Sequence, residues 1–324
     1  MLRMKATKRH PYPYNFEEFL SWFATEEDCW DYLEWLRWGE QFTCPKCGCH
    51  AAWPLKARHM RQCKKCGRQT SATAGTVFAD GRKPLRFWFH VIWMLMAQKT
   101  GMSAENFHEA FGFGSYQTSW GWLQKLRSVM VRPGRDKLCG RVEVDETFVG
   151  GQKEGARGRG AQGKTLVLVA VEGEKKQKLG RVRFRVVQKA SRDAVRNFVA
   201  DYIEKGSTIV TDGFYPYVVV EGDFQHEKYV QNPSRNGKVI KDKSQESNLE
   251  HVHLVISLLK RWLAGTLQGS VTPNHLTGYL DEFAFRFNRR KSTYRGLLFF
   301  RLVSQALTTR PLGIKDFYKS KIKM

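Results

Sequence analysis

The sequence predicts a multidomain α/β protein, and three observations support this. Apolar residues recur at helical spacing near the N-terminus, two cysteine pairs lie in a turn-rich segment near residue 50, and short valine-rich segments begin at residue 141. The 324 residues are enough for two or three domains. We expect an N-terminal helical segment (1–40), a cysteine-rich ribbon (41–80), a second helical segment (81–135), a mixed α/β core (136–305) and a basic tail (306–324).

The first predicted element is helical. In "NFEEFLSWFATEEDCWDYLEWLRWG", Phe16, Leu20 and Phe23 lie three or four residues apart, and apolar residues return at this spacing from Tyr32. The preceding basic stretch is followed by no apolar run, and the longest apolar run, 87–97, is too short to cross a bilayer. We therefore expect a soluble, intracellular protein.

The cysteine-rich segment has the spacing of a zinc ribbon. Two Cys-x-x-Cys motifs are separated by fifteen residues, and each motif directs two thiolates at one point. Four thiolates complete the closed tetrahedral shell of a structural zinc ion. The expected ligands are Cys44, Cys47, Cys63 and Cys66. Nearby Cys49, His50 and His59 remain alternative ligands.

The third segment fits two short helices around a glycine turn. Ser103 and Ser115 can cap the two helices, and Gly112 and Gly114 can form the turn between them. This pattern is typical of a helix-turn-helix, although a helical hairpin without DNA contact has the same signature. Polar residues of the second helix could contact a DNA groove or phosphates. They include Gln117, Lys125 and Arg127.

The charge of the chain points to a polyanionic partner. Lysine and arginine total 54, aspartate and glutamate total 31, and the formal net charge is +23. The basic residues recur along the whole length, which favours nucleic acid as the partner over a single charged tail. An ordinary basic surface is the alternative.

The predicted core contains acids on apolar strands. Alternation along "RVEVDETFVG" places Glu143, Asp145 and Thr147 on one face, with the valines on the other. Asp212 ends a second apolar strand, "TIVTD". Two such aspartates can converge on divalent metals, and their hard oxygen ligands favour Mg²⁺ or Mn²⁺. Two such ions support phosphodiester chemistry. Glu146 points away and is expected to be structural.

The chain resembles the insertion sequence 1595 family of transposases. The resemblance is collinear from about residue 15 to residue 305, and its order makes it specific. It is carried by "EEDCWDYLEWLRWGEQFTCPKCG", "CKKCGRQTSATAGTVF", "WFHVIWMLMAQKTGMSAENF", "VEVDETFVGG", "GRGAQGKT", "VTDGFYPY", "ISLLKRWLAGT" and "HLTGYLDEFAFRFNRR". It implies a zinc ribbon, a helical DNA-binding segment and an RNase H-like core. It also implies that Asp145 and Asp212 are the first two members of a catalytic metal-binding triad.

The third member of that triad departs from the pattern. In relatives with a glutamate triad, the third acid stands seven residues before a lysine that corresponds to Lys260, and that position here is His253. Glu250, one helical turn earlier, shares the face of His253 and is the rival. An imidazole can bind a metal or act as a base, although it adds no negative charge. Glu282, in the next helix, is expected to be structural or to pair with an arginine.

The resemblance implies a DNA transposase that cleaves the ends of its element and joins the freed 3′-OH groups to target DNA. Its partners would be double-stranded DNA, in terminal inverted repeats and target, and further copies of the chain, as a dimer or larger oligomer. It would act in the bacterial cytoplasm at the nucleoid. A DNA-binding relative without catalysis and a metal-dependent nuclease without strand transfer remain alternatives. Expected phosphate contacts are Arg157, Arg159, Lys260 and Arg261.

Overall fold

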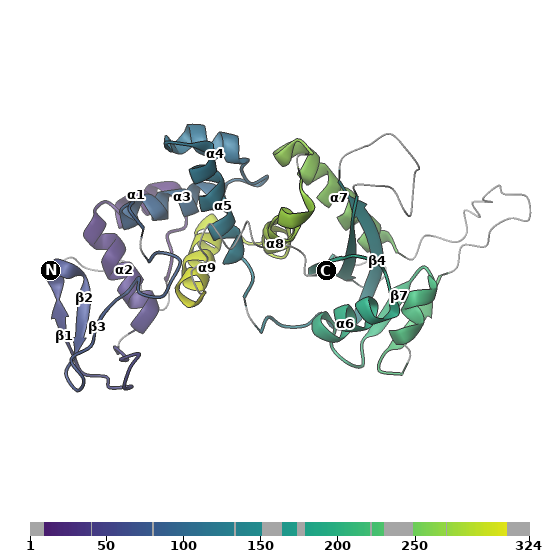
Figure 1. Ribbon diagram of the computed structural model, residues 1–324, viewed down its shortest axis with the longest axis horizontal. Helices are drawn as coiled ribbons and strands as arrows, with labels where there is room; N and C mark the ends of the chain where they lie inside the picture. The colour runs from purple at the N-terminus through teal and green to yellow at the C-terminus, as the bar shows by residue number, and fades with distance from the viewer. Residues whose placement is uncertain are drawn as a thin grey trace, which may run out of the picture. The chain divides into compact units, whose positions relative to one another are not determined.

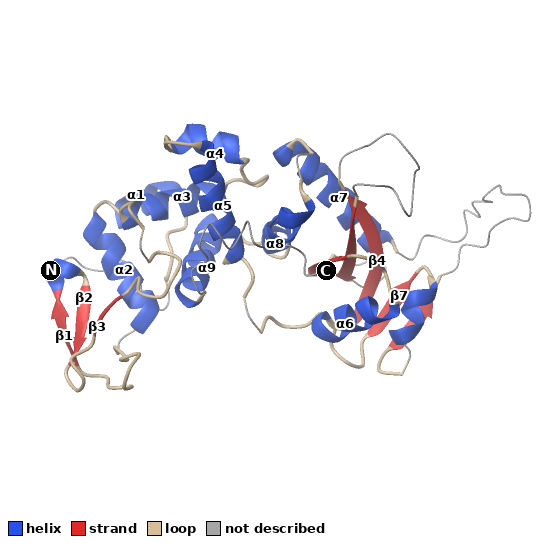
Figure 2. Cartoon of the chain, viewed as in Figure 1, coloured by secondary structure: helices blue, strands red, loops and turns tan. Residues whose placement is uncertain are grey.

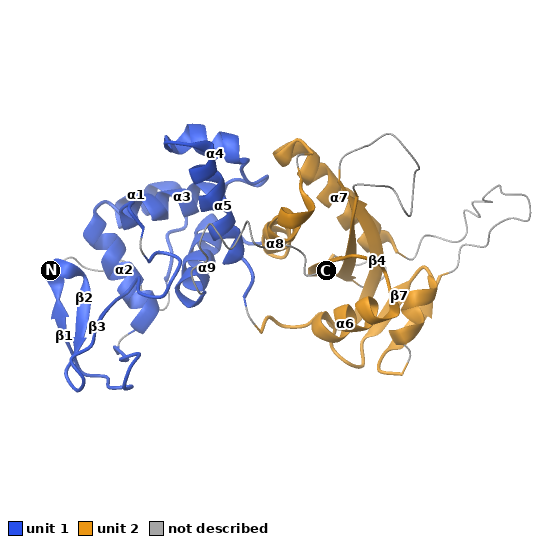
Figure 3. Cartoon of the chain, viewed as in Figure 1, with its two compact units in different colours: residues 1–132, 291–319 blue, residues 133–290, 320–324 orange. Residues whose placement is uncertain are grey.

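The computed structural model describes residues 10–39, 41–79, 81–132, 134–150, 164–173, 179–220, 222–229, 249–269 and 271–309. They form two compact units (Figure 3). The first unit contains the described residues up to 132 and those from 291 onward, and the second contains residues 134 to 290. Among the described residues, no helix is both long and apolar enough to cross a bilayer.

The N-terminal helical segment of the first unit consists of two helices, α1 (Phe16–Trp22) and α2 (Glu26–Trp38). The helical segment is interrupted between α1 and α2 because Thr25 is the N-cap of a new helix. Its hydroxyl accepts the Asp28 N–H, and the Asp28 carboxylate accepts the Thr25 N–H, which forms a capping box. Gly39 ends α2 with a φ of 59°, in the region that favours glycine.

The cysteine-rich segment forms a small antiparallel sheet, drawn in red in Figure 2. Its strands pair in the order β1-β2-β3, and a short 3₁₀ turn connects the first two strands. The elements are β1 (Ala52–Leu55), η1 (Lys56–Arg58), β2 (Met60–Cys63) and β3 (Gln69–Ser71).

The helical segment that follows contains α3 (Leu85–Ala97), α4 (Ala104–Phe111) and α5 (Tyr116–Ser128). The expected capping serines are present: Ser103 accepts the Asn106 N–H and Ser115 accepts the Thr118 N–H. Gly112 ends α4 in the left-handed conformation, with a φ of 58°. The turn between α4 and α5 therefore has the form that the sequence predicts.

The last helix, α9 (Arg295–Thr308), belongs to the first unit, although the predicted core boundary lay at residue 305. The cause is packing: Phe299 is fully buried in an aromatic cluster with residues of α1, α2 and α3. Its ring neighbours are Phe19, Phe23, Tyr32, Phe89 and Trp93. The core unit therefore ends near residue 290.

The second unit is built on a five-stranded mixed sheet with the strand order β6-β5-β4-β7-β8. The first three strands in the chain pair antiparallel, and β7 and β8 join the edge of β4 in parallel. Numbered from β4, this order is 3-2-1-4-5, as expected for an RNase H-like core. The strands are β4 (Arg141–Val149), β5 (Thr165–Glu172), β6 (Val182–Val187), β7 (Thr208–Thr211) and β8 (Gln225–Lys228).

Helices cover both faces of this sheet and complete two apolar layers. One layer packs α6 (Arg192–Tyr202) and η2 (Tyr215–Val220) against the valines of β4. The other packs α7 (Glu250–Leu267) and α8 (Pro273–Phe287) against the opposite face. Figure 1 shows α7 beside β4. The acids on that face of β4 therefore point toward α7.

Candidate metal and catalytic sites

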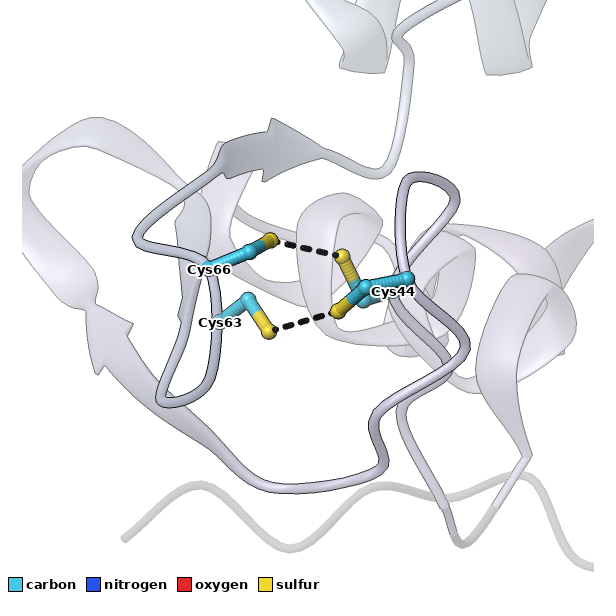
Figure 4. Close-up of side chains that lie close together, drawn as sticks. Cys44, Cys63 and Cys66 are labelled. Atoms are coloured by element: carbon cyan, nitrogen blue, oxygen red, sulfur yellow. Dashed lines mark hydrogen bonds between the residues drawn. The ribbon is translucent and has the colours of Figure 1, made fainter.

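The four predicted zinc ligands lie together in the first unit. Cys44 Sγ lies 3.6 Å from Cys66 Sγ (Figure 4). Cys47 Sγ lies 3.5 Å from Cys63 Sγ. All four sulfurs lie within 4.8 Å of one another. Tetrahedral zinc with Zn–S bonds of about 2.3 Å requires S–S distances of about 3.8 Å. The donor set therefore fits a structural zinc ion, and Cys49 is not part of it.

The thiols of Cys47 and Cys63 differ in pKa. Backbone N–H groups, first that of Cys66, lower the pKa of Cys63 to about 6. At Cys47 a backbone hydrogen bond from Cys49 lowers the pKa, but burial and the three neighbouring thiols outweigh it and raise the pKa to about 12. Four thiolates this close repel one another, so a divalent cation is needed to hold all four deprotonated.

The predicted DNA contacts of α5 differ in accessibility. Gln117 is exposed and Lys125 is partly exposed, so both side chains can reach a partner. Arg127, in contrast, is only 2% exposed and ranks among the fully buried side chains. The expectation that it contacts DNA is wrong, because it lies one turn after Leu123 on the packed side of α5. Arg157 and Arg159 fall outside the described residues.

The two predicted catalytic aspartates belong to neighbouring parallel strands in different ways: one lies within β4 and the other directly follows β7. Glu143 of β4 is paired with Val210 of β7. This is the last pair of the two strands, and Asp145 and Asp212 each stand two residues beyond it. Asp145 lies within β4, and Asp212 follows β7 directly, with its Oδ1 accepting the Phe214 N–H at 2.9 Å.

His253 is the candidate third residue that contacts Asp145. Its Nε2 lies 3.3 Å from Asp145 Oδ2. The pKa of His253 is raised, first by its hydrogen bond to Asp145, and further by the charges of Asp145, Glu143 and Asp212. Glu250, the first residue of α7, is exposed. The geometry favours His253 over Glu250.

The ligand atoms of Asp145, Asp212 and His253 are not gathered as the four cysteine sulfurs are. Three or more ligand atoms of His, Cys, Asp or Glu come within 4.8 Å of one another only at the four thiols, among the residues that the structure describes. The faces of α7 nevertheless follow the predicted pattern: His253, Ser257 and Lys260 are exposed, and Arg261 is exposed beside them. The apolar side chains Val252, Ile256, Leu259 and Leu263 are buried.

The remaining acids take structural contacts. Glu146 Oε2 accepts the Tyr217 hydroxyl at 2.8 Å on the face opposite Asp145, as alternation predicts. On α8, Glu282 Oε1 accepts from Arg286 at 2.8 and 3.0 Å, so it pairs with an arginine as expected.

Sequence reasoning missed His251 and Arg141, which both contact Glu143. A sequence signal was available: the acids at 143 and 145 and the histidines at 251 and 253 have the same two-residue spacing.

The four-cysteine ribbon and the RNase H-like core each match a transposase domain. Residues 137–288 match the ISXO2-like transposase domain, and residues 24–69 match the transposase zinc-ribbon domain of insertion sequence 1595 elements. The two matches together span well over half of the 324 residues. The chain belongs to the insertion sequence 1595 family of transposases.

A curated relative agrees with this assignment. The chain is 26% identical over 284 residues to an uncharacterised protein in transposable element ISH50 of Halobacterium salinarum. The alignment covers 82% of this chain and 91% of the relative.

Proposed function

We propose that the protein is a metal-dependent DNA transposase that cuts the ends of its insertion sequence and joins them to target DNA. The observation that carries the proposal is the contact of His253 with Asp145 on β4, whose parallel neighbour β7 is followed directly by Asp212. The family assignment supports the same activity. The proposed partner is double-stranded DNA, in terminal inverted repeats and in target, and the place of action is the cytoplasm.

Asp145 and Asp212 are the proposed ligands of two Mg²⁺ or Mn²⁺ ions. Carboxylate oxygens suit these hard cations, and an imidazole such as that of His253 is also tolerated by Mn²⁺. When bound, the ions activate the attacking oxygen and stabilise the leaving oxygen of an in-line displacement. Asp145 also holds the ring of His253, which can accept a proton from the attacking group once the imidazole is neutral.

The proposed reaction has two displacements. Water attacks the phosphorus at the element end, the P–O3′ bond breaks, and a 3′-OH is released. That 3′-OH then attacks a target phosphorus and displaces a target 3′ oxygen. Lys260 and Arg261, exposed on α7, would hold DNA phosphates. The zinc ribbon and α4–α5 would bind the terminal repeats, and two ends would be paired by a dimer or larger oligomer.

The test is cleavage and joining of labelled element ends by purified protein in Mg²⁺ or Mn²⁺. Asp145→Ala and Asp212→Ala should each lower the rates of cleavage and joining by about a hundredfold or more. Mutation of residues that merely hydrogen-bond to metal ligands already lowers activity by up to about a hundredfold. Asp193→Ala removes an exposed carboxylate of α6 and is the matched control. Full joining by both aspartate variants would show that the site is elsewhere.

The third residue is decided in the same assay. His253→Ala should lower cleavage strongly, whereas Glu250→Ala should stay near wild type; the reverse order would exchange their roles. Binding of the ends without nicks by the wild type would point to a DNA-binding relative that has lost catalysis. Nicks without joining would point to a nuclease.

A further inference from the structure

Helix α7, which carries His253, begins without a cap of its own. The residue at its N-cap position is Leu249, whose side chain accepts no hydrogen bond from the first turn. The first N–H groups of a helix have no partner within the helix, and a polar N-cap side chain normally accepts one of them. The first backbone bond of α7 runs from the His253 N–H to the Leu249 carbonyl, at 3.1 Å.

Glu143 of β4 supplies the missing acceptor from more than a hundred residues away. Its Oε2 accepts the Val252 N–H at 2.9 Å, at the third helical position, which an N-cap side chain would serve. Its Oε1 lies 3.1 Å from His251 Nδ1 and 3.0 Å from Arg141 Nη1. Glu143 is only 2% exposed, so these donors replace its solvation by water.

We propose that Glu143 is a positioning residue that fastens the first turn of α7 to β4 and thereby holds His253 against Asp145. This inference rests on the proposed function. Glu143 and Asp145 lie on one face of β4, and their contacts on α7, Val252 and His253, are consecutive residues. The carboxylate also favours the positive end of the helix dipole. Without Glu143, the Val252 N–H loses its acceptor and the turn that carries His253 frays.

Gly173, just after β5, offers an independent way to disturb the same anchor. A Cβ placed on Gly173 would lie 2.7 Å from His251 Nδ1 and 3.0 Å from its Cε1. The imidazole can pack against the backbone here because residue 173 has no side chain. Gly173→Ala would therefore push His251 from Glu143 while leaving the carboxylate and Asp145 unchanged.

The experiment combines hydrogen exchange with end cleavage, both on the full chain. The variants are Glu143→Ala, Glu143→Gln and Gly173→Ala. The control is Glu172→Ala, which breaks an ion pair on the same sheet, because Glu172 bonds to Arg181 and the Cys139 N–H. Exchange is followed by mass spectrometry in peptides covering residues 249–255. DNA affinity and thermal unfolding are measured alongside to separate local from global effects.

We expect exchange of the first α7 turn in Glu143→Ala to rise about fivefold or more, as for the loss of a helix cap. Cleavage should fall about ten- to hundredfold, as for a residue that orients an active-site group, with DNA affinity changed less than about twofold. Gly173→Ala should change in the same direction, and Glu143→Gln should recover part of the protection because its amide oxygen still accepts the Val252 N–H. Glu172→Ala should leave the turn protected.

The inference is overturned if the turn stays protected in Glu143→Ala, or if cleavage is unchanged although the turn frays. It is also overturned if Glu172→Ala frays the turn equally, since the effect would then be general destabilisation. If Glu143→Ala does not fold, Gly173→Ala and Glu143→Gln decide by the same criteria. If the wild type cleaves no DNA, the proposed function fails, and the exchange data alone decide whether Glu143 is the anchor.

Discussion

At the scale of single residues, the behaviour of an acid in the second unit depends on its partner. Glu143 and Glu282 are both nearly inaccessible, and each has an arginine within 3.0 Å. The carboxylate of Asp281, next to Glu282 on α8, is less well compensated by positive charge. Burial raises the pKa of Asp281 to about 6, and the charge of Arg135 offsets this only in part. Such a group lowers stability when it is ionised.

We therefore predict that Asp281→Asn stabilises the protein at neutral and alkaline pH. The folded-state pKa is raised above the unfolded value of about 3.9, so the folded state binds more protons between pH 4 and 6. Stability of the wild type should fall as pH rises through that window. The gain in the variant should be about 1–3 kcal/mol at pH 8 and about half as large at pH 5. Urea unfolding at the two pH values measures it; equal gains would contradict the assignment.

At the scale of elements, the cysteine-rich ribbon has short strands, and its cysteine thiols lie in its core. The sheet β1-β2-β3 has strands of four, four and three residues, which are too few to bury a substantial core of their own. Its apolar cluster includes Cys44 and Cys63, packed with Phe42. A bound zinc ion would therefore provide much of the free energy that keeps the ribbon folded.

Zinc analysis of cysteine variants tests this dependence. The wild type should contain one zinc ion per chain, and Cys63→Ser should lose it and unfold the ribbon, because one of four ligands is gone. Cys49→Ser is the matched control: its thiol lies nearby but contacts the Ala51 carbonyl at 3.8 Å, outside the four-sulfur group. Elemental analysis and the melting temperature report both effects. Zinc loss from the Cys49 variant instead would reassign the ligand.

Elements with local signals could be predicted from the sequence. Ser103, Ser115 and Ser191 each cap the helix that follows them, because a cap depends on residues only three positions apart. Alternation on β4 likewise predicted which acids face α7. The start of α7 could not be predicted in this way, because its acceptor is Glu143, 109 residues earlier. The burial of Arg127 could not be predicted either, since the face of α5 that is packed depends on tertiary structure.

At the scale of the whole molecule, the first unit is discontinuous in sequence. Its core requires α9, whose Phe299, Leu302 and Val303 are fully buried, and this helix follows the entire second unit in the chain. No local pattern indicates which unit an amphipathic helix joins, so the sequence alone misplaced the boundary. Tryptophan reports selectively on the first unit, since Trp262 is the one tryptophan between residues 133 and 290.

Deletion of residues 291–324 should therefore unfold the first unit and spare the second. Loss of a buried Phe alone costs about 3–5 kcal/mol, and the deletion removes a whole packed face. In a Trp262→Phe background, tryptophan fluorescence should report unfolding of the first unit, while limited proteolysis leaves a resistant fragment near residues 134–290. Deletion of residues 310–324 keeps α9 and should leave the fluorescence native. A native first unit after the longer deletion would show that α9 is dispensable.

The position of α9 also sets an order of events during synthesis. The ribosome makes the ribbon early, yet the unit that contains it cannot be completed until residue 308 has been translated. Domains commonly fold as they emerge, from the N-terminus onward, but here the first unit must wait for the second. We expect prematurely terminated chains to lack a stable N-terminal unit. If the first unit binds the element's ends as proposed, such fragments would compete poorly for them and would not inhibit the full-length protein.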